Sequence, residues 1–205
     1  MANLACWQFT QLPIEIVEIL EKDIHQFNEN VQPSQVAGSV VDTVIRNSKN
    51  SWVPTSHWIS GWLSYYVNKI NRENFCYDLI DIDGGSLQYT QYGEGNYYNW
   101  HTDQDVDSFY KPQLIPSSAG NISQDLTTLQ GECVRKLSFT VQLSNPEDYS
   151  GGEVQFLDNN NQTFFAPKRL GTIIVFDSRI RHRVRKVKSG VRKSIVGWCV
   201  GPRWK

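Results

Sequence analysis

The sequence predicts a mainly β (α+β) fold, in which helices precede a double-stranded β-helix, or jelly roll, and pack on one of its sheets. Two observations predict it. Apolar residues follow helical spacing in residues 13–27 and 54–70. After residue 80, short runs of strand-forming residues alternate with glycine-containing turns, a pattern typical of double-sheet barrels.

Two helices are expected before residue 80. Pro13 suits the first turn of the first helix, and Thr55 or Ser56 is expected to cap the second, after Pro54. The apolar stripe of the first helix is Ile16, Leu20, Ile24 and Phe27. That of the second is Trp58, Ile59, Trp62, Leu63, Tyr66, Val67 and Ile70. The wide aromatic face of the second helix predicts packing against a sheet.

Strands are expected at Leu87–Tyr92, Lys136–Leu143, Glu153–Leu157, Thr163–Ala166, Thr172–Phe176, His182–Val187 and Lys193–Val200. Turn residues separate these runs. If the last two strands are hairpin neighbours that turn at Ser189-Gly190, His182 and Arg192 can lie inside one barrel.

The chain is expected to be one domain, residues 1–205, with a helical part at 1–80 and a jelly-roll core at 81–205. Residues 104–134 show little periodicity and are rich in Ser, Gln, Thr and Asp. A loop this long within a compact domain is usually functional or mobile, so a lid over a site is expected, with a disordered surface insertion as the alternative.

Charge is unevenly distributed along the chain. The net charge is −1, but residues 168–205 hold twelve Lys or Arg and one acid, whereas residues 1–167 hold eight basic and twenty acidic residues. Either the two parts interleave and neutralise each other, or the basic part forms a site for an acidic ligand. The four cysteines lack CxxC spacing, and no apolar run or signal pattern is present, so we expect a cytoplasmic protein with free thiols.

Metal-binding chemistry is indicated by His101 and Asp103. One residue separates them, so on an extended chain both side chains point the same way. A distant histidine would complete two imidazoles and one carboxylate, a set that suits iron(II) and leaves positions open for a co-substrate and oxygen, although it tolerates other divalent ions. His182 is the candidate, because it opens a predicted strand whereas His25 and His57 belong to the helices.

A second candidate site residue is Arg192, ten residues after His182. Arg192 and Ser194 share one face of the last predicted strand. Inside a barrel, a guanidinium would bind a carboxylate through two parallel hydrogen bonds, and the Ser194 hydroxyl could add another. The alternative is that Arg192 faces solvent among its basic neighbours.

Three segments together resemble a known family. Tyr92–Asp103 (YGEGNYYNWHTD), Lys136–Glu153 (KLSFTVQLSNPEDYSGGE) and Arg181–Ser194 (RHRVRKVKSGVRKS) resemble the prolyl 4-hydroxylase-like 2-oxoglutarate and iron(II) dioxygenases, above all the small bacterial and phage members. The likeness covers roughly residues 80–200, and the order HxD, H, RxS is more specific than any one piece.

The resemblance implies a role for each matching residue. It makes His101, Asp103 and His182 the catalytic iron ligands, and Arg192 the partner of the distal carboxylate of 2-oxoglutarate. The further co-substrate residues that it implies are Tyr92, Thr140, Gln142, Ser194 and Trp198. On the substrate side it implies Tyr98 and Trp100. For Trp198, Thr140, Gln142 and Tyr98, the alternative is core packing.

The resemblance also implies an enzyme that hydroxylates a C–H bond, above all in a prolyl residue of a peptide or protein. Hydroxylation would be coupled to decarboxylation of 2-oxoglutarate to succinate and CO2, with iron(II), O2 and ascorbate as reductant. The alternatives are a free amino acid or small molecule as substrate, a non-catalytic jelly roll that binds metal and 2-oxoglutarate, and a structural module without metal. A nucleic-acid substrate is disfavoured, because Arg192 lacks a paired second arginine and the chain is not basic overall.

Overall fold

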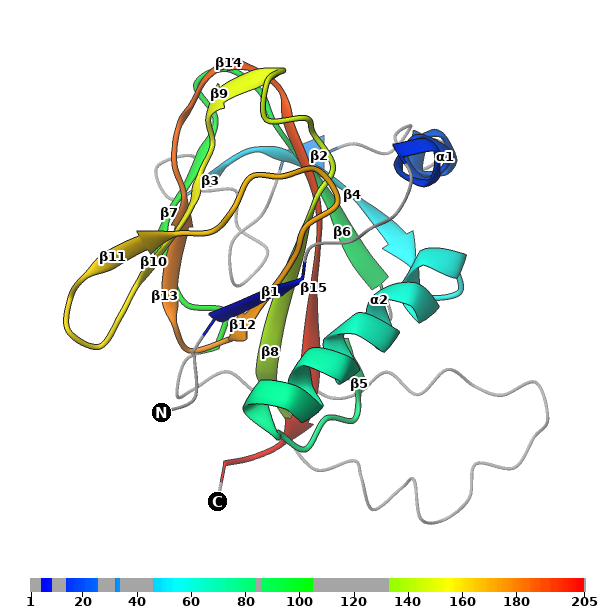
Figure 1. The fold of residues 1–205 in the computed structure, drawn as a ribbon, viewed down its shortest axis with the longest axis vertical. Helices are drawn as coiled ribbons and strands as arrows, with labels where there is room; N and C mark the ends of the chain where they lie inside the picture. Colours follow the sequence, from blue (N-terminus) through cyan, green and yellow to red (C-terminus); the bar gives the residue numbers. More distant parts are fainter. Residues whose placement is uncertain are drawn as a thin grey trace.

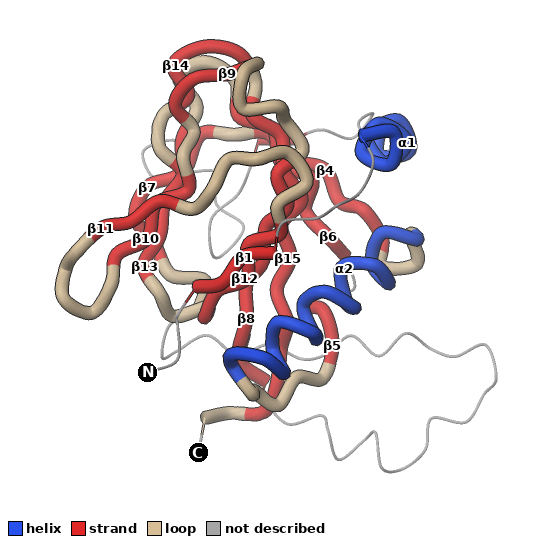
Figure 2. Tube along the Cα trace, viewed as in Figure 1, coloured by secondary structure: helices blue, strands red, loops and turns tan. Residues whose placement is uncertain are grey.

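The computed structural model describes residues 5–8, 14–25, 32–33, 46–83, 86–104 and 133–204. Two sheets of antiparallel strands face each other, and two helices lie on the outer side of the larger sheet (Figure 1). The smaller sheet stands on the opposite side of the molecule from both helices (Figure 2). This is the predicted jelly-roll arrangement with helices packed on one sheet.

The larger sheet has eight strands. In spatial order they are β1 (Ala5–Gln8), β12 (Ile173–Asp177), β8 (Cys133–Gln142), β15 (Arg192–Pro202), β6 (Ser86–Tyr92), β4 (Lys49–Pro54) and β2 (Gln32–Pro33), and β5 (Asp81–Ile82) pairs with the far end of β15. β8 and β15 alternate polar residues facing the smaller sheet with apolar residues facing the helices, as expected for strands between two different environments.

The smaller sheet has five strands in the order β11 (Thr163–Phe165), β10 (Val154–Leu157), β13 (Arg181–Val184), β7 (Tyr97–His101) and β3 (Arg46–Asn47). A separate pair, β14 (Val187–Gly190) and β9 (Tyr149–Gly151), joins the two sheets at one end (Figure 1). Consecutive strands therefore pass from one sheet to the other, which is how a jelly roll closes around its interior.

The main core lies between the helices and the larger sheet. α1 (Ile14–His25) buries Val17, Leu20 and Ile24. α2 (Trp58–Ile70), which continues into the single π-helical turn η2 (Asn71–Phe75), buries Ile59, Leu63, Val67 and Ile70. Each fully buried aliphatic side chain contributes about 1.5–3 kcal/mol, so this layer holds the helices on the sheet and leaves the opposite face of the sheet free to carry polar groups.

Three sequence-based expectations need correction, and the first two concern α2. His57, not Thr55 or Ser56, caps α2: its Nδ1 accepts a hydrogen bond from the Ile59 amide at 3.4 Å. Trp58 at the start of the helix is 45% exposed, although Trp62 and Tyr66 do pack against the core.

The strands that carry His182 and Arg192 are also not hairpin neighbours. β13 lies in the smaller sheet and β15 in the larger one, because the chain forms β14 between them. The predicted strand at 182–187 therefore ends at Val184, and both residues still reach the interior, from opposite sheets.

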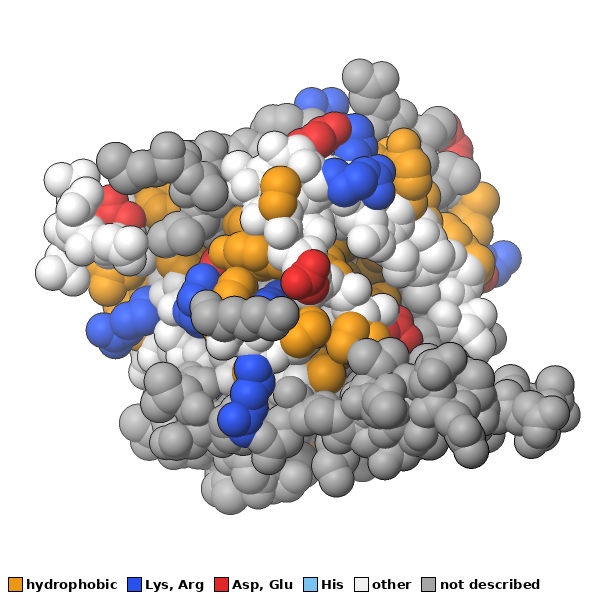
Figure 3. Space-filling model, turned by 90° about the horizontal axis from the view of Figure 1, so that it is seen from below, with side chains coloured by type: hydrophobic (Ala, Val, Ile, Leu, Met, Phe, Trp, Pro, Cys, Tyr) orange, Lys and Arg blue, Asp and Glu red, His pale blue; other side chains and the backbone are white. Residues whose placement is uncertain are grey.

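The basic and acidic parts of the chain interleave in space, as one of the two readings of the charge pattern predicts. β15 pairs with β8 and β6, and β13 pairs with β10 and β7, so basic strands lie between strands of the acidic part. Lys, Arg, Asp and Glu side chains are scattered among apolar ones on the face seen in Figure 3.

Two expectations fall largely outside the described residues. Of the predicted lid at 104–134, only Gln104 and the first residues of β8, Cys133 and Val134, are described. Cys76, Cys133 and Cys199 are free thiols, and the Cys6 side chain lies outside the described part. Within the described part, none of the helices combines the length and the apolar character that crossing a membrane requires.

Candidate functional site

The strongest cluster of potential metal ligands consists of His101, Asp103 and His182. One ligand atom from each lies within 4.8 Å of the others. His101 Nε2 is 3.7 Å from Asp103 Oδ1, and His182 Nε2 is 3.5 Å from Asp103 Oδ2. The structure thus brings together the three residues that the sequence singled out, from β7, the bend after it, and β13.

A bulge in β7 aims His101 into the interior. The pairing of β13 with β7 places His182 opposite His101 but Val184 opposite Tyr98, so β7 has one extra residue between these pairs. A bulge of this kind turns side chains that are three residues apart to the same face. Tyr98 and His101 therefore stack on each other, with ring centroids 3.5 Å apart and an angle of 14° between the planes.

Both imidazoles are fixed by backbone carbonyls. His101 Nδ1 lies 2.7 Å from the Asn99 carbonyl oxygen, and His182 Nδ1 lies 3.0 Å from that of Ile180. Because a carbonyl oxygen can only accept, each Nδ1 donates, and in the neutral ring Nε2 keeps its lone pair toward Asp103. Burial, with His182 in support, lowers the pKa of His101 to about 3, which keeps this ring neutral.

Two buried serines, Ser178 and Ser138, hold Asp103 in position. The amides of Asp103 and Gln104 both donate to the Ser178 carbonyl, at 2.9 and 3.0 Å, and the hydroxyls of Ser178 and Ser138 lie 2.9 Å apart. Burial acts to raise the pKa of Asp103, but His182, His101 and the Ser138 hydroxyl outweigh it, so the pKa lies below its usual value. Asp103 is therefore an anion held in place by its backbone.

The three residues fit a divalent metal ion. Asp103 Oδ2 is buried and has no hydrogen-bond partner among the described residues, a costly arrangement for an anionic oxygen unless a cation meets it. Two imidazole nitrogens and one carboxylate form a donor set that suits iron(II) and leaves further coordination positions open. Iron, rather than another divalent ion, is the prediction of the sequence.

Arg192 is the second buried polar feature of the interior. It is 1% exposed, and its guanidinium donates to Gln142 Oε1 at 3.0 Å and to Ser194 Oγ at 3.3 Å. β15 pairs with β6 so that Arg192 lies opposite Tyr92, and the guanidinium carbon is 5.5 Å from the Tyr92 ring centroid. Burial lowers the pKa of Arg192, against the opposing effect of Tyr92 and Tyr149.

Several buried polar atoms of the interior have no hydrogen-bond partner among the described residues. At Arg192 they are its own Nε, Gln142 Nε2 and Tyr149 Oη; Thr140 Oγ1 follows on β8, and Trp198 Nε1 lies farther along β15, opposite Ser138. Most of these atoms are donors, and all come from strands around the interior. Leaving them unpaired costs about 1–3 kcal/mol each, so the cluster fits an acceptor-rich anion such as a carboxylate.

The sequence did not point to Tyr149 or Gly152. Burial raises the pKa of Tyr149, and the nearby Arg192 opposes that rise. Gly152 has φ +64, and a Cβ there would lie 3.1 Å from Arg192 Cδ. A side chain at 152 would crowd the arginine, and the adjacent glycines Gly151 and Gly152 are the feature of the sequence that could have indicated this.

The remaining sequence-based candidates divide between the two faces of the smaller sheet. Tyr98 lies inside, stacked on His101, and burial raises its pKa. Trp100 lies beneath Arg183, whose guanidinium carbon is 4.6 Å from the ring, and Arg183 points away from the interior. The substrate-side role of Trp100 stays a prediction, on a residue that does not share the face of His101.

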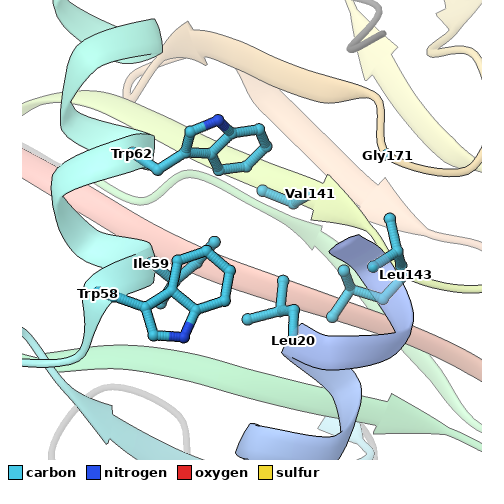
Figure 4. Close-up of a pocket in the computed structure, with 8 residues that line it drawn as sticks. Leu20, Trp58, Ile59, Trp62, Val141, Leu143 and Gly171 are labelled. Carbon is cyan, nitrogen blue, oxygen red and sulfur yellow. The ribbon is translucent and has the colours of Figure 1, made fainter. Parts of the chain in front are cut away.

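A small apolar gap lies elsewhere, between α1, α2 and β8 (Figure 4). Leu20, Trp58 and Trp62 are among its lining residues, and its volume is about 10 Å³. That volume is about enough for one water molecule, and the lining offers no polar partner, so this gap is a packing defect rather than a ligand site.

Comparison with known proteins identifies the family. A model of the 2OG-Fe(II) oxygenase superfamily matches residues 87–200. A PKHD-type hydroxylase of Prochlorococcus marinus is 42% identical over 66 residues, which is 30% of this chain and 28% of that relative. The match to this relative therefore spans less than a third of its length.

Solved structures share the fold. A prolyl-4-hydroxylase of Pseudomonas putida superposes with a TM-score of 0.68 at 18% identity, over 98% of this chain and 94% of that one. A prolyl hydroxylase from Trichoplax adhaerens, in complex with a hypoxia inducible factor oxygen degradation domain peptide fragment, gives 0.70 at 16% identity, over 96% and 83%. Because the family model covers more than half of the chain, the chain belongs to the 2OG-Fe(II) oxygenase superfamily.

Proposed function

We propose that this protein is a 2-oxoglutarate- and iron(II)-dependent dioxygenase that hydroxylates a C–H bond, with His101, Asp103 and His182 holding the metal. The observation that carries the proposal is the convergence of these three side chains on one point, with an unpartnered oxygen of Asp103 among them. Iron bound there would supply the coupling of 2-oxoglutarate decarboxylation, to succinate and CO2, with C–H hydroxylation by O2.

Backbone groups of the chain hold the three metal ligands in position. Asn99 and Ile180 hold the two imidazoles in the tautomer that presents Nε2, and Ser178 holds the backbone of Asp103. Rigid placement of this kind fixes the open coordination positions without reorganisation during the reaction.

Arg192 binds the far carboxylate of 2-oxoglutarate in this proposal. Its Nε, together with the Tyr149 hydroxyl and the Gln142 amide, has hydrogen-bonding capacity that no described residue uses. One face of β8 connects the two ends of the site: Ser138 lies beside Asp103, Thr140 follows, and Gln142 binds Arg192. From Ser138 to Gln142 the strand spans about 13 Å at the usual rise per residue. An elongated dicarboxylate between the two ends would lie along Thr140.

A prolyl residue of a peptide or protein is the proposed substrate. The family resemblance supports this choice, as does the likeness to prolyl hydroxylases, one of them solved with a peptide. The second candidate is a free amino acid or another small molecule. The third is a non-catalytic protein that binds metal and 2-oxoglutarate, which the same cluster of side chains would serve equally well.

Succinate formation tests the proposal. Protein, iron(II), ascorbate as reductant, O2 and 2-oxoglutarate are mixed with proline-rich peptides, with free proline, or with neither, and succinate is measured. We expect succinate from the wild type and from the control Asp148→Ala, which removes an exposed carboxylate. We expect none from Asp103→Ala or His182→Ala.

Two results would overturn the proposal. Succinate that persists in both variants would show that these residues do not hold the metal. Metal and 2-oxoglutarate binding without succinate, with every substrate offered, would favour the non-catalytic alternative.

A further inference from the structure

We propose that the outer face of the smaller sheet docks an acidic segment of a polypeptide. The basic face consists of Arg181, Arg183 and Arg185, together with Trp100 and Phe165 beneath two of these arginines. His182 and Val184 of β13 are buried in the interior, so Arg181 and Arg183, which alternate with them, point outward, and Arg185 directly follows the end of the strand. Both described helices lie on the far side of the molecule, against the larger sheet (Figure 1).

The guanidinium of Arg183, the central arginine, is already oriented by its neighbours. Arg183 donates through Nε to Gln155 Oε1 at 2.8 Å, while its guanidinium lies over the Trp100 ring. Its two terminal nitrogens have no partner among the described residues. Because a guanidinium that is already oriented loses less freedom when it pairs with a carboxylate, Arg183 is suited to two-point binding.

Among the described residues, acids do not balance the charge on this face. Glu153 lies 3.9 Å from Arg185, a long contact between partly exposed groups. The Asp158 carboxylate is used within its own turn, where it accepts from the amides of Asn160 and Gln162. The exposed Arg181 side chain forms no hydrogen bond, ion pair or ring contact with another described residue. Counting described residues alone, the face therefore carries three cations against one weakly paired carboxylate.

The spacing of the arginines favours an extended acidic peptide. Arginines at alternate positions of a strand, as Arg181 and Arg183 are in β13, lie about 6.6 Å apart on one face, and so do acidic side chains at alternate positions of an extended peptide. A peptide of about five residues would match the row from Arg181 to Arg185, with each carboxylate accepting from one guanidinium. Regularly alternating carboxylates thus fit this face in number, sign and spacing.

Binding can be measured without metal, 2-oxoglutarate or turnover, so its outcome is separate from that of the proposed function. A fluorescent peptide with glutamate at alternate positions is titrated with the protein at low salt, and its anisotropy is recorded. The comparison ligands are the same peptide with glutamine in place of glutamate, and a single-stranded oligothymidylate of equal charge. We expect the glutamate peptide to bind most tightly, and its binding to weaken with salt.

The test variant is Arg181→Gln/Arg185→Gln, which leaves the Arg183–Gln155 hydrogen bond intact. We expect it to weaken peptide binding about five-fold or more, as the loss of two arginine–carboxylate pairs implies. The matched control, Lys22→Gln/Arg72→Gln, removes the same charge from exposed residues of α1 and η2. It should change the affinity less than about two-fold.

Three outcomes would overturn the proposal. One is equal weakening in the test and control variants, which would mean non-specific attraction. Another is equal binding of the glutamine peptide. The third is tighter binding of the oligothymidylate through the same arginines, which would make a nucleic acid the occupant of the basic face.

Discussion

His182 lies directly opposite His101 in the pairing of β13 with β7, and the centroids of the two rings are 4.1 Å apart. Residues 81 positions apart in the sequence are therefore neighbours across a single strand–strand contact. Cross-strand neighbours are fixed by the backbone ladder itself, so the metal-ligand geometry is a property of the smaller sheet rather than of mobile side chains.

The buried serine pair is expected to support Asp103. Ser138→Ala removes the partner of the buried Ser178 hydroxyl, which should lower the free energy of unfolding by about 1–3 kcal/mol and weaken metal binding. Denaturant unfolding and anaerobic metal titration would measure the two effects. The control is Ser150→Ala, which breaks a similar 2.8 Å hydroxyl pair with Ser189 on the surface. Equal effects of the two substitutions would show that Ser138 has no special role.

Arg192→Met is expected to separate stability from ligand binding. The substitution removes a buried guanidinium whose Nε has no partner, so the ligand-free protein should keep its stability or gain it. Binding of 2-oxoglutarate should weaken at least about 100-fold, because loss of a buried charge pair costs several kcal/mol. Denaturant unfolding and calorimetric titration measure the two quantities. A strongly destabilised variant that still binds 2-oxoglutarate would contradict both expectations.

Acid should destabilise the protein partly through Asp177. Burial acts to raise its pKa, but the hydrogen bonds from Arg179 and Tyr77 outweigh burial and hold the pKa below the usual value. A carboxyl with a lowered folded-state pKa stabilises the fold above its unfolded pKa of about 3.9, and this contribution is lost as pH falls through the folded-state pKa. Asp177→Asn should therefore flatten the fall in unfolding free energy below about pH 4. An unchanged slope, equal to that of an Asp148→Asn control, would count against this role.

Gly197 is expected to be irreplaceable on the helix-facing side of β15. A Cβ there would overlap the Phe139 ring and the Leu87 side chain, both fully buried. Gly197→Ala should therefore lower the free energy of unfolding by about 1–3 kcal/mol. Gly61→Ala is the control of opposite sign: Gly61 is exposed in α2 with no atom near the added methyl, so a gain of about 0.5–1 kcal/mol is expected. Similar thermal midpoints for the two variants would refute the packing argument.

The sequence predicted several strands of the jelly roll to within one residue. These are β6, β10, β11 and β12, each a short run of strand-forming residues bounded by turn residues. β7 and β4 were missed, since the bulge at Asn99 and Trp100 and the polar, half-exposed residues of β4 hide the two-residue period.

The candidate site was predictable where spacing carries the signal and not where tertiary packing does. The two-residue interval from His101 to Asp103 is local, His182 opens a predicted strand and Arg192 follows it by ten residues, and the family resemblance gave each of them its role. Ser178 and Tyr149 come from turns and short strands that meet the site only through the closure of the two sheets. Serine and tyrosine in such segments carry no pattern that distinguishes a site residue from a surface one.

The central claim is that the metal cluster and Arg192 hold one ligand between them. Anaerobic calorimetric titration of 2-oxoglutarate, with and without iron(II), tests it most directly. If the metal and Arg192 bind the same 2-oxoglutarate molecule, the affinity for 2-oxoglutarate must depend on whether the metal is bound. We expect iron(II) to strengthen 2-oxoglutarate binding in the wild type, Asp103→Ala to abolish that enhancement, and Arg192→Met to weaken 2-oxoglutarate while leaving metal binding intact. A 2-oxoglutarate affinity that is the same with and without iron(II) would contradict the account.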